Sequence, residues 1–308
     1  MFRIRRVYEA ISPVNQAAIA RVREILREQF DQLRQSEVDS LPEKLKNPLK
    51  YKLRSILFIA DNMHGQVSGF ALLQHAPDLG FCYLDYISAA KHHTGRGIGG
   101  ALYERVRNEA MLLKASGLFF ECLPDDPALC RDPAVLKQNA SRLRFYEKYG
   151  ARPFLGTAYE TPVTPGDDNP PYLVVDPLDH SGQYSNSQMQ EIVRAILKRK
   201  YPEICDAKYV QMVVASFRDN PVRIRPPRYV REQSFTSPEI PPDRKITLVV
   251  NTLHTIHHVR DRGYVEAPVR VKAILSSLEK SNLFTLIPSR QFPEHHITAV
   301  HDKGFVAY

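Results

Sequence analysis

The chain has 308 residues, of which 43% are hydrophobic and 25% are charged, and its formal net charge is +8 with a pI of about 9.2. This length is enough for two domains, and no apolar stretch reaches the roughly 18 residues that a membrane helix needs. Residues 1–6 are basic but lack the following apolar segment of a signal peptide. A cytoplasmic protein with no membrane partner is therefore expected.

Cysteine use and charge distribution exclude further classes. The four cysteines lack C-x-x-C spacing, which favours reduced thiols over a disulfide framework or a zinc finger. The basic residues are dispersed, and the sequence contains no helix-turn-helix, zinc-finger or aromatic RNA-binding motif. A nucleic-acid partner is therefore not expected, and attraction for a polyanionic ligand together with solvated surface accounts for the charge.

The first part of the chain alternates strand and helix patterns. Residues 2–9 are predicted as a strand. Residues 55–60 and 66–75 flank the turn 61–65, which predicts a hairpin, and residues 81–88 form a third apolar strand. Between the first strand and the hairpin, an amphipathic helix is indicated by apolar residues at helical spacing, namely Val14, Ala18, Val22, Ile25, Leu26 and Leu33.

A glycine-rich turn lies between the strand 81–88 and a helical pattern at residues 101–115. The first N–H groups of such a helix are unpaired and point at whatever lies over the turn, and glycine lets a ligand approach the backbone. The spacing fits neither G-x-x-x-x-G-K-[ST] nor G-x-G-x-x-G. A phosphate site is therefore predicted, with a plain surface loop as the alternative, at Thr94, Gly95, Arg96, Gly97, Ile98, Gly99 and Gly100.

This turn resembles motif A of the GNAT superfamily of acyl-CoA-dependent N-acetyltransferases, [Q/R]-x-x-G-x-[G/A]. Thr94, Gly97 and Gly99 occupy its first, fourth and sixth places, and Thr94 departs from the family pattern. The resemblance implies that the turn binds the pyrophosphate of coenzyme A. It also implies that the preceding strand, near Ile87 and Ser88, pairs with the pantetheine arm.

A second segment, residues 139–151, is similar to the family's N-x-x-A-x-x-[LF]-Y-x-x-x-G-F ending. Asn139 is a candidate N-cap and cofactor contact, and Gly150 is placed to end the helix. The resemblance implies that Tyr146 protonates the departing coenzyme A thiolate. The alternative is that Tyr146 is an aromatic residue at the edge of the core.

The apolar run 118–124 is predicted as a buried strand that carries Glu121. Its position resembles the strand of GNAT enzymes that acetylate ribosomal-protein N-termini, in which a glutamate is the base. Asp85, in the preceding strand, is the second candidate, and a water held by Glu121 is a third. The alternative is that the carboxylate of Glu121 points to solvent.

Acetylation of an amine needs a base because an amine with a pKa of about 10.4 is almost wholly protonated at pH 7, a deficit of roughly 4 to 5 kcal/mol. A backbone N–H near Ile87 is expected to polarise the thioester carbonyl. The cysteines show no arrangement with a base that would make one a nucleophile, so direct attack in a ternary complex is expected.

The resemblance spans residues 1–178, with closing strands at 153–159 and 172–175 around the loop 162–171. The implied fold class is α+β, a mixed and mostly antiparallel central sheet flanked by helices. Residues 179–218 are predicted as a helical extension packed on this domain, with caps at Asn186 or Ser187 and at Asp206. Residues 219–244 are a proline-rich linker or a strap on the surface.

The last segment, residues 245–308, holds six of the eleven histidines, so a metal site has to be weighed. A strand at 245–253, a helix opening at Pro268 and the segments 297–301 and 305–308 resemble the opening of the arginase-like histone deacetylase and acetylpolyamine amidohydrolase family. That family's catalytic residues and zinc ligands follow this opening, so no metal is expected. The partial α/β segment should dock on the first domain, pair with another copy or a partner, or be loosely ordered.

The sequence as a whole predicts an acetyl-CoA-dependent N-acetyltransferase that modifies a primary amine and releases coenzyme A. The amine is a polyamine, a lysine side chain or another small-molecule or peptide amine. Asp125, Asp126 and Asp132 form a predicted acidic lip for a cationic substrate, with a solvated loop as the alternative. The rival hypothesis is a non-catalytic module that binds acyl-CoA or a partner protein.

Overall fold

The computed structural model divides the chain into two compact units, Met1–Glu232 (unit 1) and Gln233–Tyr308 (unit 2). In unit 1 it describes residues 2–30, 33–90, 97–163, 168–178, 180 and 182–230. In unit 2 it describes residues 240–251, 271, 274–275, 278, 283–290 and 293–307. Within these ranges, no helix combines the length and the apolar character of a membrane span.

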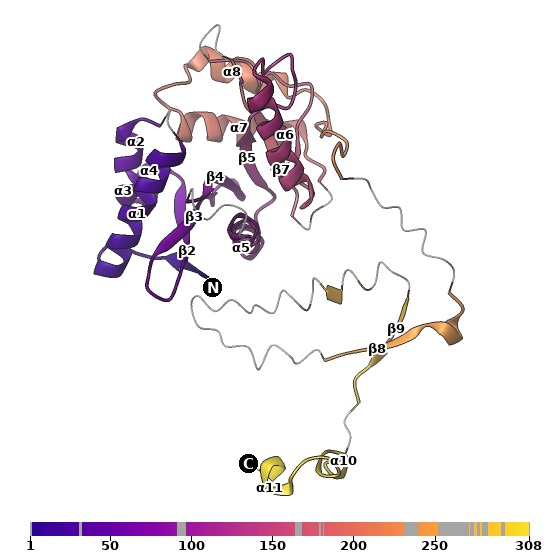
Figure 1. Ribbon diagram of the computed structural model, residues 1–308. Coiled ribbons are helices and arrows are strands. Elements are labelled where there is room, and N and C mark those ends of the chain that lie inside the picture. Colours follow the sequence, from indigo (N-terminus) through magenta and orange to yellow (C-terminus); the bar gives the residue numbers. More distant parts are fainter. Residues whose placement is uncertain are drawn as a thin grey trace. The chain divides into compact units, whose positions relative to one another are not determined.

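Unit 1 is built on a seven-stranded sheet in the order β1-β2-β3-β4-β5-β7-β6 (Figure 1). All neighbouring strands are antiparallel except β4 and β5. This mixed, mostly antiparallel sheet flanked by helices confirms the predicted fold class. The strands are β1 (Arg3–Val7), β2 (Arg54–Asp61), β3 (Val67–Ala76), β4 (Phe81–Ala89), β5 (Leu118–Cys122), β6 (Arg152–Pro153) and β7 (Tyr172–Asp176).

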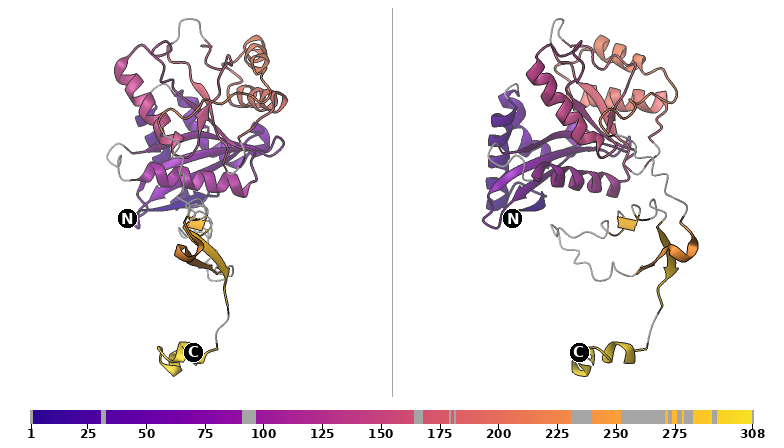
Figure 2. Two further views of the ribbon diagram at one scale, coloured as in Figure 1. Left: turned by 90° about the vertical axis from the view of Figure 1, so that its right-hand side faces the viewer. Right: turned by 45° about the vertical axis from the view of Figure 1, so that its right-hand side comes forward.

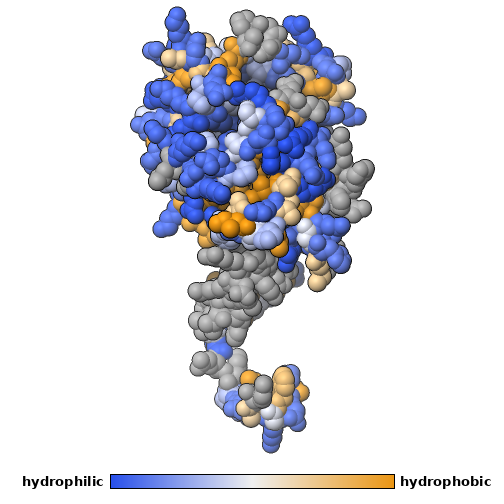
Figure 3. Space-filling view, turned by 90° about the vertical axis from the view of Figure 1, so that its left-hand side faces the viewer, coloured by the Kyte–Doolittle hydropathy of each residue, from blue (hydrophilic) through white to orange (hydrophobic). Residues whose placement is uncertain are grey.

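Helices cover both faces of this sheet (Figures 1 and 2). One face packs against α5 (Ile98–Leu112) and α6 (Pro133–Glu147). On the other face, the β2–β3 side carries α1 (Pro13–Gln29), α2 (Gln35–Asp39), α3 (Leu41–Lys46) and α4 (Pro48–Tyr51), and the β5–β7 side carries α7 (Asn186–Lys200) and α8 (Ala207–Ser216). Hydrophilic residues predominate on the surface over α1 to α4 (Figure 3).

The alternation of strand side chains explains these layers. Ile56 and Phe58 of β2 face α5, whereas Leu57 and Ile59 face α1. Each of these side chains is almost completely buried. Because successive strand residues point to opposite faces, a strand that is apolar throughout must be covered on both sides.

The boundaries of several predicted elements differ in the structure. Helix α6 begins at Pro133 with Asp132 as its N-cap, so the expectation that Asn139 is the cap is wrong. The strand predicted at 153–159 is reduced to β6, which has two residues. Leu33 lies beyond the end of α1, and Val14 on that helix is 64% exposed.

The predicted helical extension is part of the core of unit 1. The side chain of Ser185 caps α7, in place of Asn186 or Ser187, and Asp206 caps α8 as expected. Both helices pack against β5 and β7 through buried residues such as Ile192, Ile196 and Val213. Residues 222–230 (the strap) continue across unit 1, where the Ile224 backbone bridges Phe154.

Unit 2 contains a parallel pair of strands, β8 (Ile246–Val250) and β9 (Phe284–Pro288), and two short helices, α10 (His295–Thr298) and α11 (Lys303–Ala307). Three of the histidines, His254, His257 and His258, and most of the helix predicted from Pro268 onward lie outside the described residues. In the part of the chain that the structure describes, no group of three or more metal-ligating side chains is assembled.

Candidate active site

The glycine-rich turn leads into α5 as the sequence predicts. Gly97 is the N-cap of this helix with φ of +77°, a left-handed conformation that favours glycine. No side chain among the described residues caps the helix, and the first helical hydrogen bond is that of the Ala101 N–H to the Gly97 carbonyl. The N–H groups of residues 98–100 therefore have no hydrogen-bond partner among the described residues, at a helix start where an anion is favoured.

The space above this turn is open. A Cβ atom added at Gly97 or Gly99 would meet no atom within 4 Å, and one at Gly100 would lie 3.4 Å from the Tyr149 hydroxyl. Thr94, Gly95 and Arg96 lie outside the described residues. The described half of the motif therefore has both the amides and the room that a pyrophosphate needs.

The central strands separate beside this turn. β4 and β5 pair only at Cys82 with Leu118 and at Tyr83 with Phe119, although β4 continues to Ala89. Over the separated stretch, β4 pairs with β3 on its other edge. The edge that faces β5, including Ile87 and Ser88, pairs with no described strand and can hydrogen-bond an extended ligand.

A β-bulge lies at the start of this separated stretch. Leu72 pairs with Tyr86, but Leu73 pairs with Leu84, so Asp85 has no partner on β3. Such bulges bend a strand and redirect a side chain, and they are common next to active sites. Asp85 keeps the side expected from Tyr83, and the bulge shifts the alternation after it, so that Tyr86 also lies near the Lys200 ammonium.

Asp85 is held in a buried ion pair. Its side chain is fully buried, and it contacts the ammonium group of Lys200, the last residue of α7. Gln74 donates a second hydrogen bond from Nε2 to Asp85 (2.6 Å). The Oε1 atom of Gln74 is buried with no hydrogen-bond partner among the described residues, so it can accept one from a ligand.

Three aromatic rings surround the Lys200 ammonium. Its Nζ lies 5.5, 4.9 and 5.0 Å from the ring centroids of Tyr83, Tyr86 and Tyr201. Burial alone lowers the pKa of Lys200, but the neighbouring carboxylates, Asp85 first, raise it more, and the net pKa lies above its ordinary value. Lys200 is therefore a permanent cation at physiological pH.

Glu121 points into the same region, so the alternative in which it faces solvent is wrong. Its two oxygens accept hydrogen bonds from the hydroxyls of Tyr159 and Tyr201, each at 2.6 Å. Burial raises the pKa of both phenols well above the ordinary value, which keeps them as donors. With the Tyr86–Glu37 hydrogen bond (2.7 Å), these residues form one polar cluster of Glu37, Asp85, Glu121, Lys200, Tyr83, Tyr86, Tyr159 and Tyr201.

Tyr146 lies on the other face of the sheet. It is buried and packs against the rings of Phe120, Tyr103 and Phe145, with centroids at 4.5, 4.9 and 5.0 Å. Its hydroxyl donates no hydrogen bond to any residue that the structure describes. Burial raises the pKa of this phenol, so it remains protonated and retains its hydrogen for a ligand.

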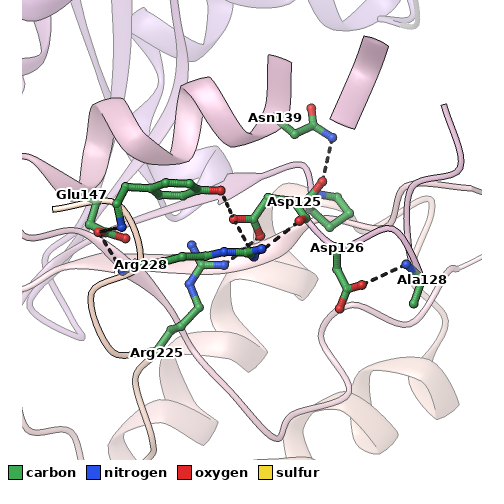
Figure 4. Close-up of polar contacts among 9 residues, drawn as sticks. Asp125, Asp126, Ala128, Asn139, Glu147, Arg225 and Arg228 are labelled. Atoms are coloured by element: carbon green, nitrogen blue, oxygen red, sulfur yellow. Dashed lines mark hydrogen bonds and ion pairs between the residues drawn. The ribbon is translucent and has the colours of Figure 1, made fainter. Parts of the chain in front are cut away.

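Asn139 has a structural contact in the middle of α6. Its Nδ2 donates to the Pro124 carbonyl (2.8 Å) and to Asn169 Oδ1 (3.2 Å), and the residue is 2% exposed (Figure 4). The amide therefore ties α6 to the segment that follows β5. Its proposed contact with the cofactor stays a prediction.

Only part of the predicted acidic lip is exposed: Asp126 and Asp132 lie at the surface, but Asp125 does not. Asp125 is buried, and it pairs with Arg225 (2.8 Å) and accepts a hydrogen bond from Tyr229 (2.5 Å) (Figure 4). Arg228 contributes a third contact at 3.3 Å. Because two arginines of the strap neutralise this carboxylate and the Tyr229 hydroxyl donates a further hydrogen bond, it is not available to attract a substrate. Asp132 is likewise engaged as the N-cap of α6.

Glu147, at the end of α6, holds the strap by its backbone. The N–H groups of Arg228, Tyr229 and Val230 all donate to Glu147 Oε1, at 2.9, 2.6 and 2.7 Å. Glu147 is 5% exposed, so these are buried, charge-assisted hydrogen bonds. The strap is thereby fixed next to the helix turn that carries Tyr146.

An open cleft leads to the polar cluster. It has a volume of about 270 Å³ and lies between α2–α3 and the C-terminal end of α7. Glu37, Gln74, Lys200 and Tyr201 line its inner part. The cleft reaches Gln74, Lys200 and Tyr201, and these residues separate it from Asp85 and Glu121.

The order of elements in unit 1 defines its class. A strand and helices precede three antiparallel strands, the glycine turn with α5, a parallel strand and a tyrosine-bearing helix, as expected of an acyl-CoA-dependent acyltransferase. Residues 19–151 match the model of the acetyltransferase (GNAT) family. These residues therefore form a GNAT acetyltransferase domain.

Solved structures provide further comparisons. YncA of Salmonella typhimurium, solved with its cofactor acetyl-CoA, is 15% identical, with 59% of this chain and 96% of that chain covered and a TM-score of 0.43. The ribosomal-protein-S18-alanine N-acetyltransferase of Escherichia coli is 16% identical, with 59% and 97% covered and a TM-score of 0.41. Tetrahymena GCN5 is 9% identical, with 57% and 96% covered and a TM-score of 0.40. No curated protein sequence matches the chain.

Proposed function

We propose that unit 1 transfers the acetyl group of acetyl-CoA to a primary amine by direct attack in a ternary complex. The observation that carries this proposal is the separation of β4 from β5 beside the uncapped start of α5. A strand edge and a set of helix amides meet there, as an extended ligand ending in a diphosphate requires. Coenzyme A is such a ligand, and the described residues fit it.

In this proposal, the cofactor supplies an activated thioester. The amides of residues 98–100 bind the pyrophosphate, and the free edge of β4 near Ile87 and Ser88 binds the pantetheine arm. A backbone N–H of the same edge stabilises the oxyanion that forms when the amine adds to the thioester carbonyl. The bulge at Asp85 places this edge beside the polar cluster.

Glu121 is the better candidate for the base. Among the described residues, its carboxylate accepts hydrogen bonds from two neutral phenols, whereas Asp85 is paired with the ammonium of Lys200. Glu121, directly or through a water, accepts the proton that the acceptor amine must lose before attack. Asp85 then has the role of fixing Lys200 and the strand around the bulge.

Tyr146 donates its phenol proton to the departing thiolate. Its hydroxyl is buried and its hydrogen is uncommitted among the described residues, which suits a general acid. A covalent acetyl-cysteine route is disfavoured because burial raises the pKa of Cys82 and that of Cys122 to about 12. Parallel double-reciprocal plots, or an acetylated enzyme trapped by mass spectrometry, would contradict direct attack.

The test is thiol release from acetyl-CoA with a panel of amines, measured for the wild type and Tyr146→Phe. Turnover should fall about tenfold or more in the variant. Tyr209→Phe, which removes a phenol hydroxyl from α8, is the matched control and should retain full rate. Coenzyme A affinity by calorimetry should be unchanged in both variants. Binding without turnover on any amine would instead support a non-catalytic acyl-CoA-binding module.

For unit 2, we propose that residues 245–308 are a partial α/β segment that pairs with another copy of the chain or with a partner. Parallel strands are usually buried on both faces, yet Ile246, Val249 and Leu286 are 58%, 54% and 61% exposed. The resemblance to the deacetylase-like family stays a prediction. Light scattering of the full chain would contradict self-pairing if it showed a monomer at all concentrations.

A further inference from the structure

The cleft that reaches the polar cluster continues into a second, larger one. The second cleft has a volume of about 620 Å³ and lies between α4 and the outer side of α7. Tyr51, Arg199 and Pro202 line both clefts, so the two form one continuous groove. We call it the acceptor groove, with an outer part at α4 and an inner part at the polar cluster.

The outer part of the groove is strongly basic. Arg199 is paired with Asp78 (2.8 Å), but Lys52, Arg194 and Lys198 form no ion pair with any described residue. Their positive charge is therefore available to a ligand. Lys50 is likewise paired, with Glu43 at 3.6 Å, so in this lining one carboxylate, Glu191, stands against three cations without an ion pair among the described residues.

The inner part has the opposite balance. Glu37 lines it directly, and Asp85 and Glu121 lie behind Gln74, Lys200 and Tyr201. Glu203, Arg34 and Lys44 also line this part, where Arg34 pairs with Glu203 and Lys200 pairs with Asp85. Glu37 and Glu121 therefore face one further cation, Lys44, which forms no ion pair with a described residue. The tyrosine rings around Lys200 show that this environment already stabilises an alkylammonium group.

A groove with opposite charges at its two ends discriminates among amines. A polycation is attracted by the carboxylates at the inner end but is repelled by the cations at the outer end. A neutral tail has no electrostatic attraction to the outer cations. An amine with an anionic group at its far end satisfies both parts. Asp125, one of the three carboxylates expected to attract a polycation, is neutralised by the strap.

From this charge pattern we infer that the acceptor is a small molecule carrying a primary amine and, some bonds away, a carboxylate or phosphate. This inference rests on the proposed function and narrows its substrate class. The amine lies near Glu121, and the anionic group lies against Arg194, Lys198 and Lys52. The groove has the size of a small-molecule site rather than that of an extended polymer surface.

The test compares four acceptors with the same carbon chain: diaminobutane, aminobutanol, aminobutanoate and aminobutyl phosphate. In the wild type, kcat/KM should be about tenfold or more higher for an anionic acceptor than for aminobutanol, which corresponds to about 1.4 kcal/mol. Diaminobutane should be the poorest. The carboxylate and phosphate arms show which anion the groove prefers, and either preference supports the inference.

The variant Arg194→Glu/Lys198→Glu tests the groove itself. Both side chains are exposed, so the fold should survive, and thermal unfolding checks this. In this variant, kcat/KM should become higher for diaminobutane than for the anionic acceptors, mainly because KM rises for the anionic acceptors. Lys208→Glu, an exposed charge reversal on α8 outside the groove, is the control and should leave the preference unchanged.

Equilibrium binding separates this inference from the proposed function. Each acceptor is titrated by calorimetry into the protein with coenzyme A, for the wild type and both variants. Anion-selective binding that the double reversal abolishes would support the inference even if none of the four were acetylated. Equal affinity for the four compounds, tighter binding of diaminobutane, or an unchanged preference in the double variant would overturn it.

Discussion

The buried pair of Lys200 and Asp85 gives the sharpest test of how the polar cluster is built. Lys200→Met keeps an unbranched side chain of similar length but removes the charge. The side chains of Lys200 and Asp85 are 7% and 0% exposed, so water cannot replace the lost partner. Among the described residues, Asp85 would be left as a buried carboxylate with the Gln74 hydrogen bond alone.

The expected loss of stability follows from this burial. Removing one partner of a buried ion pair typically costs about 3 to 5 kcal/mol, because the other charge stays uncompensated. That is a large part of the roughly 5 to 15 kcal/mol that stabilises an ordinary domain. The double variant Lys200→Met/Asp85→Asn removes both charges together and should recover most of the loss.

The free energy of unfolding should be measured by urea denaturation at neutral pH for the wild type, both single variants and the double variant. A double-mutant cycle then isolates the coupling between the two residues. A loss of stability below about 1 kcal/mol for Lys200→Met would refute the reasoning, because that is all that exposed ion pairs contribute. Additive losses in the double variant would refute it as well, because they would show no coupling between the two residues.

The same pair predicts a pH dependence. The pKa of Lys200 is raised in the folded protein, so its contribution to stability is fully present below the unfolded pKa of about 10.4. That contribution is lost as the pH rises through the folded pKa. The stability difference between the wild type and Lys200→Met should therefore be constant from neutral pH to about pH 10 and should narrow above it. A difference that stays constant throughout the alkaline range would contradict the pairing.

Two further variants test the strap and the glycine turn. Glu147→Gln weakens the charge-assisted bonds to the strap, so stability should fall by roughly 1 to 3 kcal/mol. Amide exchange at residues 228–230 should accelerate, and unchanged protection would argue against the Glu147 anchor. Gly97→Ala should cost about 1 to 2 kcal/mol in thermal unfolding because of its left-handed φ, and should weaken coenzyme A binding. The control is Gly99→Ala, which lies at a helical position and should leave the stability of the protein unchanged. A loss of stability in Gly97→Ala alone then reports backbone strain rather than the presence of a methyl group in the turn.

Local patterns predicted most of the fold of unit 1. The apolar strands around the hairpin and the amphipathic α1 are specified by side chains that recur with period 2 or 3.6. The start of α6 was missed because Asn139 is a good N-cap residue in sequence, whereas Asp132 with Pro133 supplies the observed cap. The reduction of β6 to two residues depends on tertiary contacts with β7 and the strap, which no local pattern records.

The candidate site was only partly predictable for the same reason. Glu121 and Asp85 were identified from the strands that carry them. Their partners come from far along the chain, since Lys200 is 115 residues from Asp85 and Tyr201 is 80 residues from Glu121. In sequence, Lys200 is the end of a basic run, and a basic helix end is ordinarily a solvated surface that complements the helix dipole.

Helix α7 shows why composition alone cannot predict the substrate. Its apolar side, with Ile192 and Ile196, packs on the sheet and fixes how the helix is rotated. That rotation sets Arg194 and Lys198 along the outer part of the groove, while the helix end delivers Lys200 to Asp85. One basic helix thus contains a cation that neutralises a buried carboxylate and, in the inferred acceptor groove, cations that attract an anion. The net charge of +8 cannot distinguish these uses, and only the position of each cation relative to the sheet does so.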